Sequence, residues 1–282
     1  MTRIRSWRYC LPAAVLFLGS ACGHSAPVLR LATTTTVEGS GLLEALSPEF
    51  ESQCRCRLQA VAFGSGQALS ILEHGDADVS LTHDPEREQK TVSAGVVQRY
   101  AKVAFNDFLI AGPPADPAGV RQTAGAVDAM RRIARSGAPF TSRGDSSGTH
   151  TREVKLWARA GAAPSSPALI ETGQGMAATL RVASERQAYV LTDRATFAQL
   201  ASSLRLAALV EGGDDLINTY GVIIRTGLPN DRLDRATIFF NWMADGRGRS
   251  IIESYRVKGQ QMFQVWPAGD PRDRPDDLPH AR

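Results

Sequence analysis

The sequence has no strong charge of either sign once its first residues are set apart. The formal net charge is +3, and Arg3, Arg5 and Arg8 stand among the first 21 residues, which contain no acidic residue. Removing these three charges takes the net charge from +3 to 0. A neutral chain lacks the basic surface that binds a phosphate backbone, so we expect no nucleic-acid partner.

The chain also lacks a long apolar run. Residues 11–18 are apolar but too few to span a bilayer, and no later segment approaches about 18 apolar residues. With the arginines before them and small residues after them, they predict a secretory signal peptide over residues 1–22 and a periplasmic or other extracytoplasmic protein. Cys22 is placed for lipidation, which would be the protein's one membrane anchor. Gly19 stands where lipoprotein signals carry an aliphatic residue, so ordinary cleavage after Ala21 is the alternative.

Cysteines are few: four in 282 residues. Apart from Cys10 and Cys22, only Cys54 and Cys56 remain, in an oxidising compartment where disulfides form. Two cysteines separated by one residue close a loop too short for strong stabilisation, and further metal ligands do not stand nearby. We expect either a local disulfide or two free thiols at a helix-to-strand junction.

Residues 74–83 have the composition of a metal site but not its spacing. His74, Asp76, Asp78 and His83 match no standard set of ligands. We therefore expect solvated side chains here, and neither a metal ion nor a cofactor in the protein.

Most of the chain repeats one unit: an apolar strand, a glycine-rich turn and an amphipathic helix. This repeat predicts an α/β fold with ligands at the carboxyl ends of the strands. Strands near residues 105–112 and 218–224 are candidates to cross between two lobes. The tail from Ala268 is rich in Pro, Asp and Arg, and we expect it to be disordered. We expect three tryptophans to pack in the core or between the lobes and not to contact a ligand: Trp157, Trp242 and Trp266.

Four strand-to-helix turns carry threonine, serine and glycine: residues 33–41, 64–67, 142–149 and 173–176. The start of a helix presents unpaired N–H groups and the positive end of the helix dipole, so it attracts anions. Arg143 is the one cation in these turns, and Asp145 is close enough to pair with it. Many neutral donors and one cation suit a small, fully ionised tetrahedral oxyanion. Taken singly, each turn has a simpler explanation, because threonines favour strands and short glycine turns are common.

Several short motifs run through these turns and the segments between them. They are Ala32-Thr33-Thr34-Thr35-Thr36, Gly64-Ser65-Gly66-Gln67-Ala68, Asn106-Asp107-Phe108, Ser142-Arg143-Gly144-Asp145, Ser147-Gly148-Thr149-His150, Glu171-Thr172-Gly173-Gln174-Gly175-Met176, Leu191-Thr192-Asp193-Arg194 and Tyr220-Gly221-Val222. In these motifs, and from about Leu29 to Phe263, the chain resembles the substrate-binding proteins of tungstate ABC transporters, which have the type II periplasmic binding protein fold.

The resemblance implies a two-lobed α/β protein with two hinge strands and a ligand cleft between the lobes. Lobe one would comprise residues 28–110 and 213–282, and lobe two residues 111–212. The lobes would close on a tungstate or molybdate ion. A membrane permease would recognise the closed form, and a cytoplasmic ATPase would drive release. We expect these partners, a monomeric protein and no enzymatic activity.

The resemblance also implies which residues hold the oxyanion: Thr33, Thr34, Ser65, Arg143, Ser147 and Thr149. Further candidates in the same turns are Thr35, Gly66, Gly148, Gln174 and Gly175. Thr36 stands where the family usually has serine, and its additional methyl group could narrow the pocket.

Two alternatives stay open. The same donors suit molybdate, sulfate or phosphate, or an oxyanion sensor; hydrogen phosphate needs an acceptor, which Asp145 supplies unless it pairs with Arg143. The second alternative is a serine hydrolase, because Ser146 or Ser147 stands near His150 and Asp145. These residues crowd one turn and the motif G-x-S-x-G is absent, so we expect His150 to cap or pack near a helix start instead.

Overall fold

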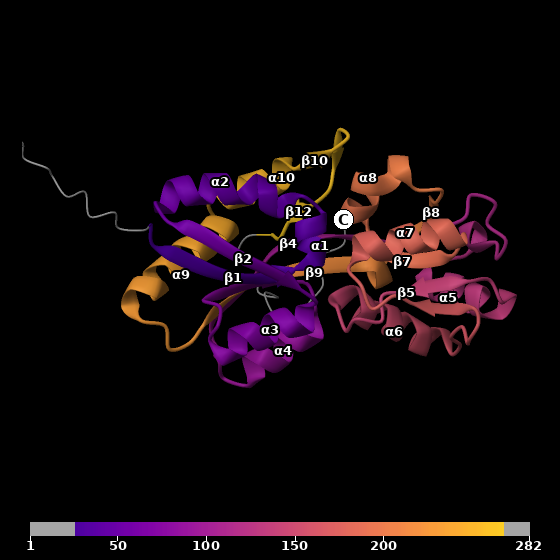
Figure 1. Ribbon diagram of the computed structural model, residues 1–282, viewed down its shortest axis with the longest axis horizontal. Helices are drawn as coiled ribbons and strands as arrows, with labels where there is room; N and C mark the ends of the chain where they lie inside the picture. Colours follow the sequence, from indigo (N-terminus) through magenta and orange to yellow (C-terminus); the bar gives the residue numbers. More distant parts are fainter. Residues whose placement is uncertain (1–25, 268–282) are drawn as a thin grey trace, which may run out of the picture.

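The computed structural model describes residues 26–267, which form an elongated α/β structure (Figure 1). The predicted signal peptide, Cys22 and the tail from Ala268 lie outside the described residues. Within residues 26–267, no helix combines the length and apolarity needed to cross a bilayer.

One mixed sheet runs along the molecule. Its strands follow the order β2-β1-β3-β9-β4-β7-β5-β6, and β8 and β12 also pair with β4. The pairs of β1 with β2 and β3, and of β5 with β6 and β7, are parallel, whereas β9 and β4 run antiparallel to their neighbours. A separate pair is formed by β10 and β11. The bounds are β1 Val28–Thr34, β2 Arg57–Phe63, β3 Val79–Thr82, β4 Val97–Gly112, β5 Phe140–Ser142, β6 Leu169–Glu171, β7 Tyr189–Asp193, β8 Ala207–Glu211, β9 Ile217–Arg225, β10 Arg256–Val257, β11 Gln260–Gln261 and β12 Gln264–Val265.

Helices cover both faces of the sheet (Figure 1). In one half α2, α9 and α10 lie opposite α3 and α4, and in the other half α7 and α8 lie opposite α5 and α6. The helices are α1 Thr35–Gly39, α2 Leu42–Cys54, α3 Ser65–His74, α4 Pro85–Ser93, α5 Ala126–Ser136, α6 Gly148–Ala160, α7 Met176–Arg186, α8 Arg194–Leu200, α9 Asn230–Ala244 and α10 Arg247–Ser254. Short 3₁₀ turns are η1 Val120–Gln122, η2 Ala201–Ser203 and η3 Asp214–Leu216.

Helix α5 illustrates how the sequence sets an element. Ala126, Met130 and Ile133 recur at spacings of three or four residues and are buried, which is the pattern of an amphipathic helix. The helix ends at Gly137, whose φ of +68° is a left-handed conformation that glycine adopts without strain.

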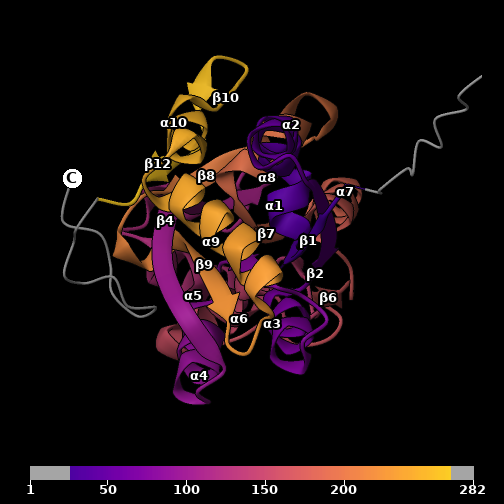
Figure 2. The ribbon, with the colours of Figure 1, turned by 90° about the vertical axis from the view of Figure 1, so that its left-hand side faces the viewer.

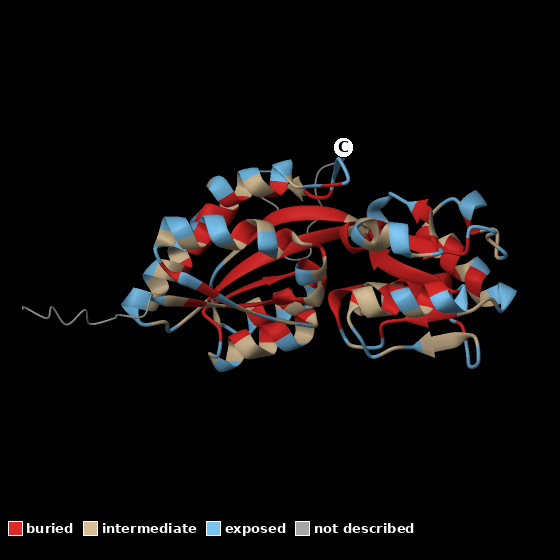
Figure 3. Ribbon diagram, turned by 45° about the horizontal axis from the view of Figure 1, so that its top comes forward, coloured by how far each residue is buried: buried red, intermediate tan, exposed pale blue. Residues whose placement is uncertain are grey.

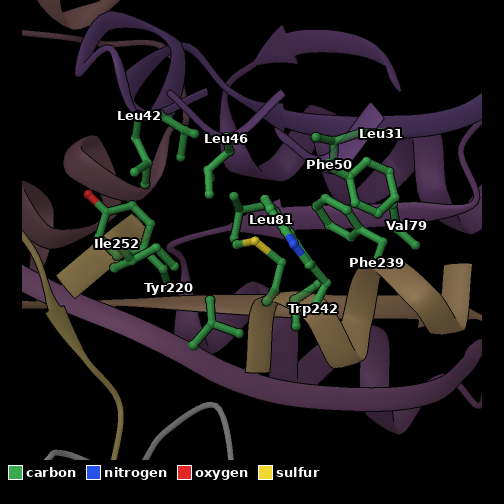
Figure 4. Close-up of a cluster of buried hydrophobic side chains, with 14 of the residues drawn as sticks. Leu31, Leu42, Leu46, Phe50, Val79, Leu81, Tyr220, Phe239, Trp242 and Ile252 are labelled. Carbon is green, nitrogen blue, oxygen red and sulfur yellow. The ribbon is translucent and has the colours of Figure 1, made fainter. Parts of the chain in front are cut away.

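Buried residues are concentrated on the central strands and on the helix faces turned toward the sheet (Figure 3). In the largest cluster, Phe50 of α2 packs edge-on against Phe239 of α9 with ring centroids 4.9 Å apart, and against Trp242 at 5.3 Å (Figure 4). Trp157 and Trp266 are buried as well, so the expectation that all three tryptophans pack in the core or between the lobes is confirmed.

Strand β4 joins the two halves of the sheet. It pairs with β9 as far as Asp107 and with β7 from Phe108 onward. The chain returns after β8: Leu216 packs in the core of the second half, and Ile217 then pairs with Asp107. The chain thus crosses twice between two α/β lobes, which Figure 2 shows one behind the other. The fold class expected from the sequence is therefore confirmed. The expected lobe boundaries, after residues 110 and 212, stay a prediction.

Two local expectations were wrong. The turn after β1 is a short helix, α1, because Thr34 caps it by accepting a hydrogen bond from the Val37 amide at 3.1 Å. Asp78 is not a solvated turn residue but is 1% exposed, and it forms ion pairs with Arg30 and Arg232. Of the two states expected for Cys54 and Cys56, the structure has the disulfide.

Candidate functional site

The four turns singled out in the sequence meet between the lobes. They connect β1 to α1, β2 to α3, β5 to α6 and β6 to α7. A Cβ atom on Gly64 would lie 3.3 Å from the carbonyl oxygen of Asp145, and one on Gly175 would lie 3.5 Å from the side chain of Thr35. Figure 1 shows α1 beside α7 and α3 beside α6. Each lobe therefore contributes two helix starts to one site.

Arg143 follows β5 and is the cation of the site. Its side chain is 1% exposed although it carries a charge. The guanidinium donates from Nη1 to Thr36 Oγ1 and from Nη2 to Thr35 Oγ1, both at 3.1 Å, and forms an ion pair with Asp145. It therefore lies against helix α1 of the opposite lobe.

Asp145 uses both of its carboxylate oxygens. Oδ2 pairs with Arg143, and Oδ1 accepts a hydrogen bond from the Ser147 amide at 3.1 Å. The pairing that the sequence left open is thus the one between Arg143 and Asp145. Because hydrogen phosphate needs an acceptor for its proton, an Asp145 whose two oxygens already accept hydrogen bonds is less available to it, which favours fully ionised anions.

Three buried donors of the site have no protein partner among residues 26–267: Ser65 Oγ, Thr149 Oγ1 and Arg143 Nε. Ser65 and Thr149 are 0% exposed. A buried donor without a partner costs about 1–3 kcal/mol, so such a set is unfavourable unless a ligand accepts from it. Ser65 is the first residue of α3 and Thr149 the second of α6, so backbone N–H groups of both helix starts accompany these hydroxyls.

Two further predicted residues act as helix caps. Thr34 accepts from the Val37 amide at 3.1 Å, and Ser147 accepts from the His150 amide at 3.3 Å. A hydroxyl that accepts one hydrogen bond still has its own proton to donate. Thr34 and Ser147 can therefore each cap a helix and donate to an anion at the same time.

The remaining candidates differ in what their side chains do. Thr33 donates to the Leu81 carbonyl at 2.9 Å, so its hydroxyl joins β1 to β3 in this structure. The side chain of Gln174 is exposed. Gly66, Gly148 and Gly175 offer backbone groups at the starts of α3, α6 and α7. The assignment of all these residues as ligands stays a prediction.

The lobes also touch where the cleft opens to solvent. A cavity of about 520 Å³ lies there, lined by residues of both lobes. Thr151 of α6 donates to Asp84 Oδ2 at 3.0 Å, and Lys155 pairs with Glu86 of α4 at 2.7 Å. The two lobes are therefore in contact here, as a closed form requires.

His83 is a residue of this site that the sequence interpretation missed. We expected a solvated side chain, but it is 1% exposed, because β3 ends one residue earlier at the same sheet edge as the other turns. A Cβ atom on Gly148 would lie 2.5 Å from the His83 carbonyl oxygen. Burial, and then the charge of Arg143, lower the pKa of His83 to about 3, so the imidazole is neutral. The expectation that ligands lie at the carboxyl ends of the strands, applied to β3, would have included His83.

A buried carboxyl group lies near the same arginine. Asp193 is 0% exposed and caps α8 by accepting from the Thr196 amide at 2.8 Å. Burial raises the pKa of Asp193, and the charge of Arg143 opposes this shift. A raised pKa shifts this carboxyl toward its uncharged form, in which it repels an incoming anion less.

The arrangement does not support hydrolysis. Ser147 accepts from the backbone amide of His150, and His150 Nδ1 accepts from the backbone amide of Ser146 at 3.1 Å. The imidazole thus caps the turn, as expected, and is not paired with a serine hydroxyl. In the part of the chain that the structure describes, no group of three or more His, Cys, Asp or Glu side chains is arranged to hold a metal ion.

Two hinged α/β lobes with anion donors buried between them define a solute-binding protein. The family model described as a PBP superfamily domain matches residues 22–247. The chain is 37% identical to a putative ABC transporter anion-binding protein of Haloferax volcanii over 253 residues, 87% of this chain and 74% of that protein. It is also 37% identical to the tungstate-binding protein TupA of Peptoclostridium acidaminophilum, with 80% of each chain covered.

A solved structure agrees with these relatives. The tungstate ABC transporter structure from Geobacter sulfurreducens superposes with a TM-score of 0.74 at 38% identity, covering 81% of this chain and 98% of that one. The chain therefore belongs to the PBP superfamily and, within it, to the family that contains these tungstate-binding relatives. The relatives carry the names of binding proteins, in agreement with the expectation that this chain is not an enzyme.

Proposed function

We propose that the protein captures tungstate outside the cytoplasm and delivers it to an ABC transporter. The observation that carries this proposal is the set of buried donors without protein partners, Ser65, Thr149 and Arg143 Nε, on both sides of the interlobe site. They suit an anion that accepts hydrogen bonds at every oxygen. Relatives named as tungstate-binding proteins support tungstate as that anion.

Molybdate is the nearest competitor, because it has the same charge and shape. Sulfate is smaller, and hydrogen phosphate carries a proton for which Asp145, already bonded at both oxygens, is a poorly available acceptor. We therefore expect the order tungstate, then molybdate, with sulfate and phosphate far weaker. Beyond the captured anion, we propose no resident metal or cofactor.

The test is a thermal melt of the purified protein, alone and with each of the four anions. A ligand at about a hundred times its dissociation constant adds roughly 2.7 kcal/mol to the free energy of unfolding, a shift of several degrees. Arg143→Ala should abolish the shift, whereas Arg135→Ala, at an exposed arginine of α5, should preserve it. No shift with any oxyanion would refute the proposal, together with the alternatives that bind another oxyanion.

We further propose that a permease recognises the closed lobes, that a cytoplasmic ATPase drives release, and that the protein acts as a monomer. Transporter-associated relatives support the permease. For the N-terminus we propose that the signal peptide is cleaved before Cys22 and that this cysteine then carries a lipid. The intact mass of the exported protein distinguishes a lipidated Cys22 from ordinary cleavage after Ala21.

A further inference from the structure

His83 occupies a place where one edge of its ring faces the hinge strands. The ring lies near Tyr220, with centroids 5.3 Å apart, and near Phe108, at 6.4 Å. Its Nδ1 atom is 3.2 Å from the side-chain oxygen of Asn218 on β9. Nε2, on the opposite edge of the ring, is buried and has no partner among the described residues.

Nδ1 ends a buried network that connects the two central strands. The Asn218 amide lies 2.9 Å from Asn106 Oδ1 on β4 and 2.9 Å from the Tyr220 hydroxyl, which is 3.3 Å from Asn106 Oδ1. Asn106, Asn218 and Tyr220 are each at most 3% exposed. The same atomic positions satisfy this network with the side-chain amides in either of two orientations.

The two orientations differ in what they leave unpaired. In one, Asn218 Oδ1 accepts from His83 Nδ1–H, and Asn106 Nδ2 is a buried donor without a partner among the described residues. With both amides reversed, Asn106 donates to Asn218, Asn218 donates to His83 Nδ1, and an unpaired oxygen replaces the unpaired amide. Buried carbonyl oxygens tolerate this better than buried N–H groups. The reversed orientation puts the imidazole proton on Nε2, so it costs less once a bound anion accepts from Nε2–H.

A proton on Nε2 turns that buried, unpartnered atom into a donor, in a residue that contacts the site. His83 lies against Gly148 at the start of α6 through its carbonyl group and Nδ1, and the charges of Arg143 and Asp145 both act on the imidazole. A neutral N–H group donates to an oxyanion without adding a charge that must be neutralised when the site is empty. It also resembles the other donors of the site, of which only Arg143 is charged.

We propose that His83 is a ligand of the captured oxyanion, to which it donates from Nε2–H, and that Asn106, Asn218 and Tyr220 hold it in this tautomer. The inference rests on the proposed function, since it concerns the same site. It connects the ligand with both hinge strands, because the residues that orient the imidazole belong to β4 and β9.

Two variants of His83 separate donation from packing. The amide of His83→Gln reaches the position of Nε2, whereas that of His83→Asn reaches only the position of Nδ1. Tungstate binding is measured by calorimetry for both variants and for the unchanged protein, with melting curves to confirm folding. We expect His83→Asn to bind on the order of ten- to a hundredfold more weakly, and His83→Gln to bind within about threefold of the unchanged protein.

The tautomer is measured independently by nitrogen NMR on the ¹⁵N-histidine-labelled protein saturated with tungstate. We expect a proton on Nε2 of His83, whose signal is assigned by its loss in His83→Asn. A proton on Nδ1 in the complex, undiminished binding by His83→Asn, or an equal loss in both variants would each overturn the inference. If His83→Asn does not fold, the signal is assigned with His83→Gln and the tautomer decides. Absence of binding by the unchanged protein would instead refute the proposed function.

Discussion

Arg143 donates from Nη1 to Thr36 Oγ1 over 3.1 Å, across the boundary between the lobes. Both side chains are buried, at 1% and 0% exposure. The hydroxyl of Thr36 is thus a partner of the site's one cation, at the position where the resemblance described above implies serine. The contact uses the hydroxyl oxygen and not the methyl group, so the replacement of serine by threonine keeps it.

The matched pair Thr36→Ser and Thr36→Val tests this contact. Thr36→Ser keeps the hydroxyl, and we expect its dissociation constant for tungstate to stay within about threefold of the unchanged protein. Thr36→Val keeps the shape but leaves a buried guanidinium N–H without its partner, which costs about 1–3 kcal/mol, or roughly 5- to 150-fold in affinity. Calorimetry with tungstate measures both. Equal affinities for the two variants would contradict the role assigned to this hydroxyl.

The contacts at the mouth of the cleft should contribute to affinity because they form only when the lobes close. Thr151→Val removes the hydrogen bond to Asp84 and should weaken tungstate binding by up to about tenfold. Lys155→Ala removes the ion pair between Lys155 and Glu86, whose side chains are 40% and 56% exposed, respectively. Because exposed pairs contribute little, we expect tungstate binding to weaken by about fivefold or less. The dissociation constants should be measured at low and high salt. Salt should cancel the effect of Lys155→Ala but not that of Thr151→Val, and the reverse pattern would count against this account of closure.

The fold was predictable from the sequence because the repeat of strand, turn and helix is local. Each glycine turn marks where a strand ends, and parallel strands bring their carboxyl ends to one edge of a sheet. For the same reason, the turns containing Ser65, Arg143 and Ser147 were expected together, and the structure brings them together.

Residues whose role depends on distant neighbours were not predictable. Asp78 has the composition of a solvated turn residue, yet Arg232, 154 positions away, pairs with it in the buried interior. His83 is likewise buried by Phe108 and Tyr220, whose approach follows from the sheet order and not from nearby sequence. The pairing of Asp145 with Arg143 was only one of two possibilities, since neighbouring charges do not settle which partner is used.

The core of lobe one should respond strongly to the loss of one ring. Phe50 is 0% exposed and packs against Phe239 and Trp242 (Figure 4). Phe50→Ala should lower the free energy of unfolding by about 3–5 kcal/mol, and Phe50→Leu by clearly less, because it leaves a smaller cavity. Urea unfolding measures both values. Equal losses for the two variants would show that the ring's volume is not what stabilises this cluster.

Glu88 should make stability fall as the pH rises. Its carboxyl is 0% exposed and accepts from the Thr82 hydroxyl at 2.7 Å, the Asp84 amide at 3.1 Å and the Tyr100 hydroxyl at 3.1 Å. Burial raises the pKa of Glu88 from 4.5 to about 7. The folded protein therefore binds the proton more tightly than the unfolded chain. The resulting stabilisation is complete below pH 4.5 and is lost as the pH rises through 7.

Glu88→Gln measures this contribution directly, because glutamine resembles the protonated carboxyl. Between pH 5 and pH 8 the free energy of unfolding of the unchanged protein should fall relative to Glu88→Gln by on the order of 2–3 kcal/mol. Glu153 has a pKa raised to about 7 by burial, and His83 one lowered to about 3, but both are present in both proteins, so their effects cancel in the difference. The control is Glu253→Gln, at an exposed glutamate of α10, which should follow the unchanged protein at every pH. If the stability of Glu88→Gln also follows that of the unchanged protein at every pH, Glu88 is ionised in the folded protein at pH 5. Its hydrogen-bond donors would then stabilise the charge more than burial destabilises it.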